Sequence, residues 1–193
     1  MKKVLFVALL SVATVFGVSA QKLSGDISQL KGQKQVNLVL DFSGALVNGK
    51  AESKYIAEET KGKTEAEKEK WLSEWNEKMR NEAFAMLSKD IDKAVKEKWF
   101  SVGNYPEAEY TIIVKVIDLT TGFFAGPFQK PSAIKASVKF TKTSNRTPFA
   151  TAEFKRSSSK ISGTIPYFVT RIALSFGTLG DDIAKMINKN LKK

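Results

Sequence analysis

Three consecutive stretches in which apolar and polar residues alternate dominate the second half of the chain. They lie at residues 110–122, 132–144 and 147–156. A period of two puts every second side chain on the same face of a strand, so each stretch predicts a strand with a buried face. A polar Ser-Asn-Arg sequence at 144–146 marks a turn between the last two. The three strands therefore predict an antiparallel meander.

A long helix is predicted before the meander. Across residues 65–98, apolar residues recur at steps of three to five, which is the spacing of a helix with one apolar stripe. Thr64 and Glu67 match a capping box at its start, because each side chain can bond the backbone N–H of the other. Trp71 and Trp75 lie on this stripe, and we interpret them as core residues.

A second helix is predicted at the C-terminal end. Thr164 is its expected cap, with Pro166 in the first turn, and an apolar stripe covers residues 168–191. Gly177 and Gly180 each disfavour a helix by about 1 kcal/mol relative to alanine. We therefore expect another element to pack closely against these two glycines.

An alternating strand at residues 35–43 completes the element order β-α-β-β-β-α. We expect an α/β protein of the α+β two-layer sandwich type, with a four-stranded mixed sheet and two long helices on one face. If the first two strands are neighbours, the long helix crosses over between parallel strands. The opposite face of the sheet is then partly open to water.

The first twenty residues match the three-part pattern of a secretory signal peptide. Lys2 and Lys3 precede an apolar run over residues 4–18, and Ala20 ends a small-residue cleavage site. The uncharged stretch has at most seventeen residues, fewer than the ~20 that a membrane-spanning helix needs. We expect cleavage after Ala20, a periplasmic or extracellular location, a single globular domain over residues 21–193, and no transmembrane span.

The chain contains no histidine and no cysteine. Their absence excludes imidazole bases, thiolate nucleophiles, and the nitrogen and sulfur ligands of ordinary zinc, copper and iron sites. We therefore expect no catalytic residues, no metal, no cofactor and no enzymatic activity. A carboxylate pair drawn from Asp41, Asp118 and Glu153 remains the catalytic alternative.

The chain is strongly basic, with a formal net charge of +11 that becomes +9 without Lys2 and Lys3. A charge of this size favours encounters with anionic partners. For an exported protein, these are lipid head groups, acidic glycans and other proteins, and we expect no nucleic acid.

Four lysines are predicted on the open face of the sheet. Lys135, Lys139 and Lys155 occupy outward positions, and Lys115 joins them from the central strand. We favour the interpretation that these lysines keep a solvated face soluble and discourage edge pairing. The alternative is a shallow cationic surface that binds an acidic glycan, lipid head groups or an acidic protein.

Three phenylalanines occupy the connection between the first two strands of the meander. Phe123, Phe124 and Phe128 stand there among two glycines and two prolines. We favour rings that fold over the end of the core, because an exposed apolar patch is unfavourable. The alternative is a finger that contacts a membrane or a partner, in which case the three rings are binding residues.

Several segments resemble a known group of proteins. These are QLKGQKQVNLVLDFSGALVNG, the tryptophan-containing helix, AEYTIIVKVIDLTTGFFAGPFQKPSAIKASVKFTKTSNRTPFATAEF and TRIALSFGTLGDDIAKMI. They are similar to small exported Bacteroidetes proteins of unknown function, whose fold resembles the N-terminal domain of TolB. The resemblance implies the same element order, an envelope location and, by analogy, a role in protein interaction. It implies no catalytic or binding residues.

These observations predict a non-enzymatic exported domain that binds another component of the cell envelope, in the first place a protein. The alternative is a binding module for acidic glycan or lipid head groups that uses the basic face of the sheet. An enzyme based on a carboxylate pair comes third.

Overall fold

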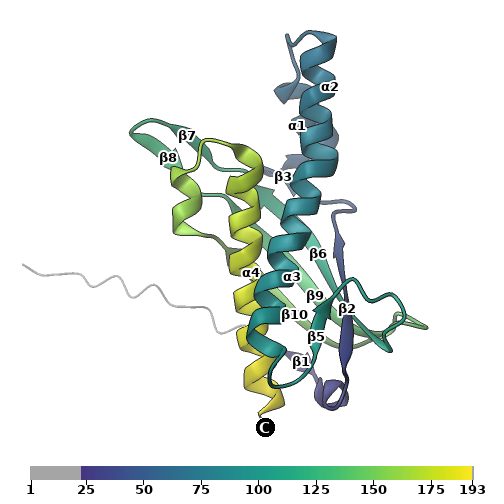
Figure 1. The fold of residues 1–193 in the computed structure, drawn as a ribbon. Coiled ribbons are helices and arrows are strands. Elements are labelled where there is room, and N and C mark those ends of the chain that lie inside the picture. The colour runs from purple at the N-terminus through teal and green to yellow at the C-terminus, as the bar shows by residue number, and fades with distance from the viewer. Residues whose placement is uncertain (1–22, 193) are drawn as a thin grey trace, which may run out of the picture.

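The computed structural model of this protein describes residues 23–192, and the predicted signal peptide lies outside this range. The centre is a mixed sheet whose long strands follow the spatial order β10, β9, β6, β2 (Figure 1). They are β2 (Gln35–Asp41), β6 (Tyr110–Thr120), β9 (Ala133–Lys142) and β10 (Pro148–Ser157). Strands β2 and β6 are parallel, whereas β6, β9 and β10 form the predicted antiparallel meander.

Short strands extend this sheet, so the expected count of four strands is wrong in detail. The additions are β1 (Ser24–Gly25), β3 (Leu46–Val47), β4 (Lys50–Ala51) and β5 (Ser101–Gly103). Strand β1 pairs with β10, β5 pairs with β2, and the β3–β4 hairpin is joined to β6 through β3. Two or three residues are too few for an alternating pattern to be visible in the sequence.

The expected layout of two helices is also wrong in detail. The observed helices are α1 (Glu52–Glu59), α2 (Glu65–Ser73), a π-helix (Glu74–Met79), α3 (Arg80–Val95) and α4 (Phe168–Leu191). Short 3₁₀ turns cover Ser28–Leu30 and Lys160–Thr164. Helix α1 was not predicted, and α4 begins at Phe168 rather than after the expected cap, because residues 160–164 form the second 3₁₀ turn.

The start of α2 has the predicted capping box. The backbone N–H of Thr64 donates to the Glu67 carboxylate at 2.9 Å, and the N–H of Glu67 donates to the Thr64 hydroxyl at 3.4 Å. Two backbone donors that the helix leaves free are therefore satisfied.

The π-helix fits the spacing of the buried stripe. The fully buried residues of the π-helix and α3 follow one another at steps of four: Trp75, Met79, Ala83, Leu87, Ile91 and Val95. In an α-helix with 3.6 residues per turn, each step of four advances the stripe by about 40°. A π-helix has i→i+5 bonds and a wider turn, which reduces this drift between Trp75 and Met79.

An aromatic cluster joins α1 to the long helix. The rings of Trp71 and Trp75 are stacked 5.5 Å apart, and Tyr55 of α1 packs on both. Phe168, the first residue of α4, stacks on the same pair. Trp75 is fully buried, so its predicted role as a core residue is confirmed.

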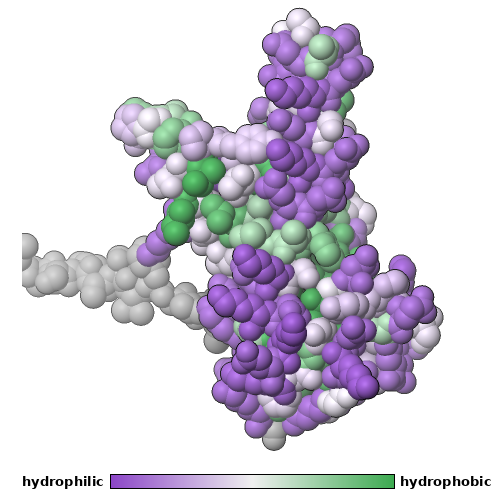
Figure 2. Space-filling model, viewed as in Figure 1, coloured by the Kyte–Doolittle hydropathy of each residue, from purple (hydrophilic) through white to green (hydrophobic). Residues whose placement is uncertain are grey.

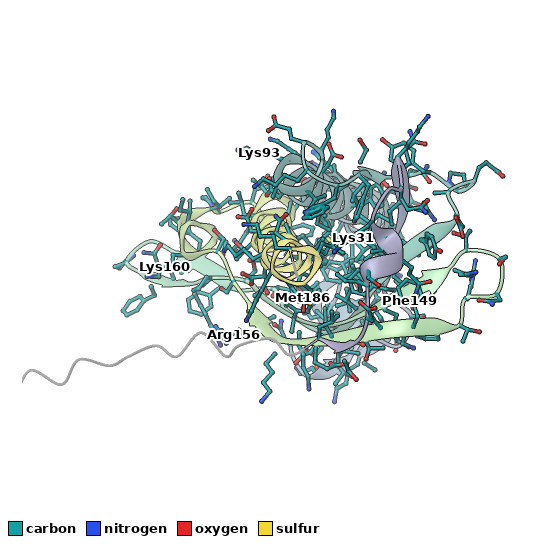
Figure 3. All side chains as sticks on the ribbon, turned by 90° about the horizontal axis from the view of Figure 1, so that it is seen from below. Lys31, Lys93, Phe149, Arg156, Lys160 and Met186 are labelled. Atoms are coloured by element: carbon teal, nitrogen blue, oxygen red, sulfur yellow. The ribbon has the colours of Figure 1, made fainter. Side chains whose placement is uncertain are left out.

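Helices α3 and α4 lie side by side on one face of the sheet (Figures 1 and 3). The side chains predicted to point inward from the long strands are buried beneath them. These include Ile112, Val114, Val116, Ile134, Ala136, Val138, Phe140, Ala152 and Phe154. Gly180 provides the predicted close approach, because a Cβ there would stand 2.8 Å from the Leu87 carbonyl oxygen. Among residues 23–192, no helix is both long and apolar enough to cross a bilayer.

Candidate functional site

A separate two-stranded hairpin projects from the end of the main sheet (Figure 1). It consists of β7 (Phe123–Ala125) and β8 (Phe128–Lys130), paired antiparallel. The turn contains Gly126 with φ +59°, a backbone conformation that glycine adopts readily. Strands β7 and β8 pair with each other, so their backbone N–H and C=O groups form hydrogen bonds without joining the main sheet.

The rings of the hairpin face solvent, so the favoured expectation that they fold over the core is wrong. Phe128 is 73% exposed, Phe123 48% and Phe124 39%. Ile161, in the 3₁₀ turn that packs against both hairpin strands, is 66% exposed. We call these four side chains the hairpin patch. Figure 2 shows apolar residues gathered on the projection and on the segment below it.

The base of the hairpin is held by buried hydrogen bonds. The Arg171 side chain, in a residue only 6% exposed, donates from Nε to the Thr121 carbonyl oxygen at 3.0 Å. Its Nη1 donates to the carbonyl oxygens of Ile165 at 2.6 Å and Pro166 at 2.9 Å. Burial lowers the pKa of Arg171 below its usual value. In the described part of the chain no ion pair involves Arg171, so main-chain dipoles balance its charge.

Asn48 secures the other side of the base. Its Oδ1 accepts from the Thr121 N–H at 3.0 Å, and its Nδ2 donates to the Thr121 hydroxyl at 3.0 Å. The next residue, Gly122, has φ +67°, and a Cβ there would overlap the Lys130 carbonyl group. The two strands of the hairpin therefore start from a fixed point.

Buried serines fix the strand that leaves the hairpin. The N–H of Ser132 donates to the Ser162 hydroxyl at 3.1 Å, and its own hydroxyl donates to the Arg171 carbonyl oxygen at 2.7 Å. The Ser132 and Ser175 hydroxyls are 2.5 Å apart. Sequence reasoning missed both this network and Arg171, because isolated serines and one arginine in a helical stripe give no pattern.

The open face of the sheet carries the predicted lysines. Lys135, Lys139 and Lys155 are exposed and alternate with the buried residues of their strands, and Lys115 is half-buried. In the ladder pairing, however, Asp118 lies opposite Lys135 and Asp41 opposite Lys115. Glu153 lies on the same face, opposite Ser137. Acidic and basic groups therefore alternate across the face.

The environment of Asp41 reflects this mixture. Burial acts to raise the pKa of its carboxyl, but hydrogen bonds from Ser43 and the charges of Lys115 and Lys139 outweigh it. The pKa of Asp41 therefore lies below its ordinary value. The Ser43 N–H donates to Asp41 Oδ1 at 2.7 Å. An ionised carboxylate of this kind balances the lysines and is not set up as a general acid.

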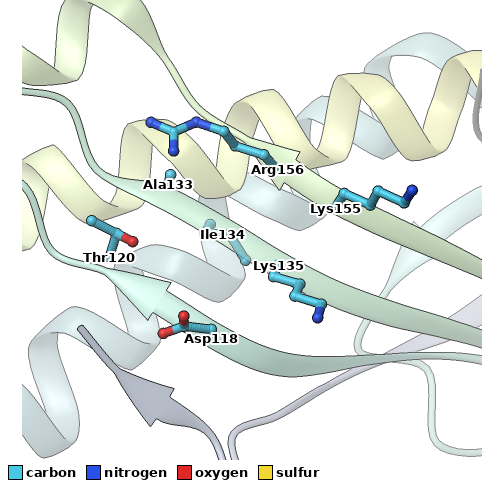
Figure 4. A pocket seen from close by; sticks show the side chains of 7 residues that line it. All are labelled: Asp118, Thr120, Ala133, Ile134, Lys135, Lys155 and Arg156. Carbon is cyan, nitrogen blue, oxygen red and sulfur yellow. The ribbon is translucent and has the colours of Figure 1, made fainter. Parts of the chain in front are cut away.

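A shallow pocket lies on this face beside the base of the hairpin (Figure 4). Its cavity volume is about 150 Å³, and it is lined by Asp118, Thr120, Ala133, Ile134, Lys135, Lys155 and Arg156. A register shift between Phe154 and Ser157 interrupts the alternation of β10. As a result Lys155 and Arg156 are both exposed and both line the pocket. The lining therefore carries three cations and one carboxylate.

The carboxylates considered for catalysis lie on three different strands. Asp41 is on β2, Asp118 on β6 and Glu153 on β10. In the ladder, Lys115 and Ser137 stand between Asp41 and Glu153. The Gly49 N–H donates to Asp118 at 3.3 Å. Within residues 23–192, no cluster of three or more acidic groups could hold a metal ion.

No protein-family model and no curated protein matches this chain. Among solved structures, a PelC dodecamer from Paraburkholderia phytofirmans has 7% identity and a TM-score of 0.43, over 83% of this chain and 96% of that one. A Xanthomonas campestris protein of family DUF330 has 14% identity and a TM-score of 0.31, over 54% of this chain and 64% of that one. Likenesses this weak add no argument about function.

Proposed function

We propose that this protein is an exported, non-enzymatic domain that binds another component of the cell envelope through the hairpin patch. The observation that supports the proposal is the exposure of Phe123, Phe124 and Phe128 on a projection whose base is fixed by buried hydrogen bonds. Phe123 and Phe124 are consecutive in β7 and therefore lie on opposite faces, so both faces of the hairpin carry an exposed ring. Exposed apolar surfaces of this kind commonly mark interaction sites. Binding residues also commonly sit on loops that a rigid scaffold positions.

The chemistry of the remaining surface supports a binding role over catalysis. The chain has neither histidine nor cysteine, and the lowered pKa of Asp41 keeps this carboxylate ionised. The larger of the two described pockets, between α1 and α2, is lined mainly by lysines, short side chains and Glu65. No residue that lines this pocket is hydrogen-bonded to a general base, as a catalytic nucleophile would be.

Photo-crosslinking tests the proposal in cells. We expect a benzophenone side chain at Phe128 to form a covalent adduct with an envelope component, because this ring is the most exposed apolar side chain described. The matched control is the same group at Val39, which is 38% exposed on β2 and lies away from the hairpin. The adducts are read by gel mobility and mass spectrometry. Equal labelling from both positions, or none from Phe128, would contradict the proposal.

The lysines of the open face favour a second candidate, a module that binds acidic glycans. Four lysines at an anionic surface supply at most ~4 kcal/mol, which corresponds to a Kd of about 1 mM. Because Asp41, Asp118 and Glu153 share the face, we expect weaker binding still. The measurement is calorimetric titration with polygalacturonate at physiological salt. A Kd well below 1 mM that Lys139→Glu abolishes would establish the second candidate.

A further inference from the structure

The shape of the hairpin patch restricts what it can contact. Phe123, Phe124 and Phe128 lie on a thin two-stranded projection, and neither described pocket is lined by any of them. A convex apolar tip fits a partner protein only where that protein has a groove of complementary shape. Fluid acyl chains, by contrast, close around any shape. Aromatic side chains are also enriched at the boundary between membrane and water.

The charge around the hairpin is one-sided. The hairpin and the 3₁₀ turn packed against it hold two lysines and no acidic residue. Lys130 lies in the hairpin opposite Phe123, and Lys160 directly precedes Ile161. Cations placed next to inserted apolar groups are the arrangement that binds the surface of an anionic bilayer.

The cationic pocket stands where a lipid head group would be. Two of its lining residues flank the hairpin in sequence, because Thr120 ends β6 and Ala133 begins β9. Three cations in its lining, Lys135, Lys155 and Arg156, outweigh the single negative charge of Asp118. Arg156 presents a fork of N–H donors suited to phosphate oxygens. The cavity of about 150 Å³ has room for one phosphate group.

The rigid base reduces the entropy lost on binding. Arg171, Asn48 and Ser132 hold the ends of the hairpin before any contact is made. A binding loop that is already ordered does not lose conformational entropy when it meets its target. A second copy of this chain is a poorer occupant, because two positively charged projections would repel each other.

We infer that the hairpin patch inserts into the surface of a membrane that contains anionic phospholipid, while the pocket of Lys135, Lys155 and Arg156 receives a lipid phosphate. This inference rests on the proposed function and names the component that the hairpin binds. It divides the interaction into an apolar part, carried by the rings, and an ionic part, carried by the cations around the base.

Vesicle co-sedimentation of the secreted chain tests both parts. The probes are vesicles of phosphatidylcholine alone and vesicles with about one third phosphatidylglycerol. We expect binding to the anionic vesicles to be at least tenfold tighter at low salt and to weaken as salt rises. Equal affinity for both vesicles, or no binding to either, would overturn the inference.

Two sets of variants separate the parts. Replacing Phe123, Phe124 and Phe128 together by serine should weaken binding by about a thousandfold, since each of the three rings contributes roughly a factor of ten. Val39→Ser removes a comparably exposed apolar side chain from the open face and should change nothing. If the triple variant binds as tightly as the parent chain, the rings do not insert.

The charge variant combines Lys130→Glu, Lys155→Glu and Arg156→Glu. It should abolish the preference for phosphatidylglycerol and leave the weak affinity for phosphatidylcholine. The control combines Lys96→Glu, Lys98→Glu and Lys142→Glu, which change the net charge by the same amount; all three residues are exposed, and Lys142 ends β9 at the opposite end from the hairpin. If the control variant binds anionic vesicles as weakly as the charge variant, net charge alone causes the attraction, and the proposed role of the pocket is overturned.

A tryptophan at the tip gives an independent readout of depth. In Phe128→Trp, the emission of the new indole should shift to the blue with anionic vesicles and be quenched by brominated acyl chains. The three native tryptophans supply the background, which is subtracted with the parent chain. A Phe128 crosslink to a protein in cells without any vesicle binding would leave the proposed function standing and refute the membrane as its target. A dimer that the triple serine variant abolishes would likewise refute the membrane as the target of the hairpin.

Discussion

Arg171→Met should lower the free energy of unfolding by about 3 kcal/mol. The substitution keeps an apolar stem of similar length but removes the donors that serve the carbonyl oxygens of Thr121, Ile165 and Pro166. Hydrogen bonds from a charged group are stronger than neutral ones, and acceptors left buried without a donor are destabilising. Urea denaturation followed by circular dichroism measures the loss.

The same variant should loosen the base of the hairpin. Because Arg171 bonds the residue that precedes Gly122, backbone amides of residues 121–130 are expected to exchange hydrogen faster. Arg156→Met is the matched control, since Arg156 is exposed, and it should leave stability and exchange in the hairpin nearly unchanged. Arg171→Lys should restore only part of the loss, because one ammonium group cannot reach three carbonyl oxygens. Equal destabilisation by the two methionine variants would show that Arg171 has no special role.

Gly180→Ala should be destabilising by about 2–3 kcal/mol, although alanine is the better helix former by about 1 kcal/mol. The added Cβ would lie 2.8 Å from the Leu87 carbonyl oxygen and 3.2 Å from the Asp90 Cβ. Neither neighbour can rotate away, so α4 must move off α3 and loosen the contact between the two long helices. The midpoint of urea denaturation reports the change.

Gly177→Ala is the control on the same helix. There the Cβ would meet the Asp90 Oδ2 at 2.5 Å and the Met86 Cε at 3.3 Å. Both atoms end side chains that can turn aside, so strain and improved helix propensity should nearly cancel, within about 1 kcal/mol. Equal losses for both glycines would mean that close backbone contact is not the cause.

The main elements could be predicted because they are long enough to have a period. Alternation over ten residues or so identified β6, β9 and β10 and the face that each buries. The capping box located the start of α2. By contrast, β1, β3 and β4 have two residues each, and only their pairing with distant residues defines them as strands.

The surfaces were harder to predict, for two physical reasons. The open face was assigned from single strands, and the alternation did place Lys135, Lys139 and Lys155 outward. The charge of this face depends on which residues of neighbouring strands lie opposite the lysines. The strand pairing places Asp118 opposite Lys135 and Asp41 opposite Lys115. For the phenylalanines, packing was expected because an exposed apolar patch is unfavourable, whereas the observed hairpin pairs its own strands and packs on the 3₁₀ turn, and its rings remain in water.

The register shift in β10 gives one strand two different surfaces. In a regular strand, Arg156 would take the position after Lys155 and point under α4, where its guanidinium would need a counter-ion. The shift instead delays the inward position by one residue, to Ser157, whose hydroxyl donates to Asp182 of α4 at 2.9 Å. Two neighbouring positive charges therefore meet solvent together. Removing either Lys155 or Arg156 would restore the regular alternation with Ser157 still inward, and it would halve the positive charge that this strand presents beside the projection.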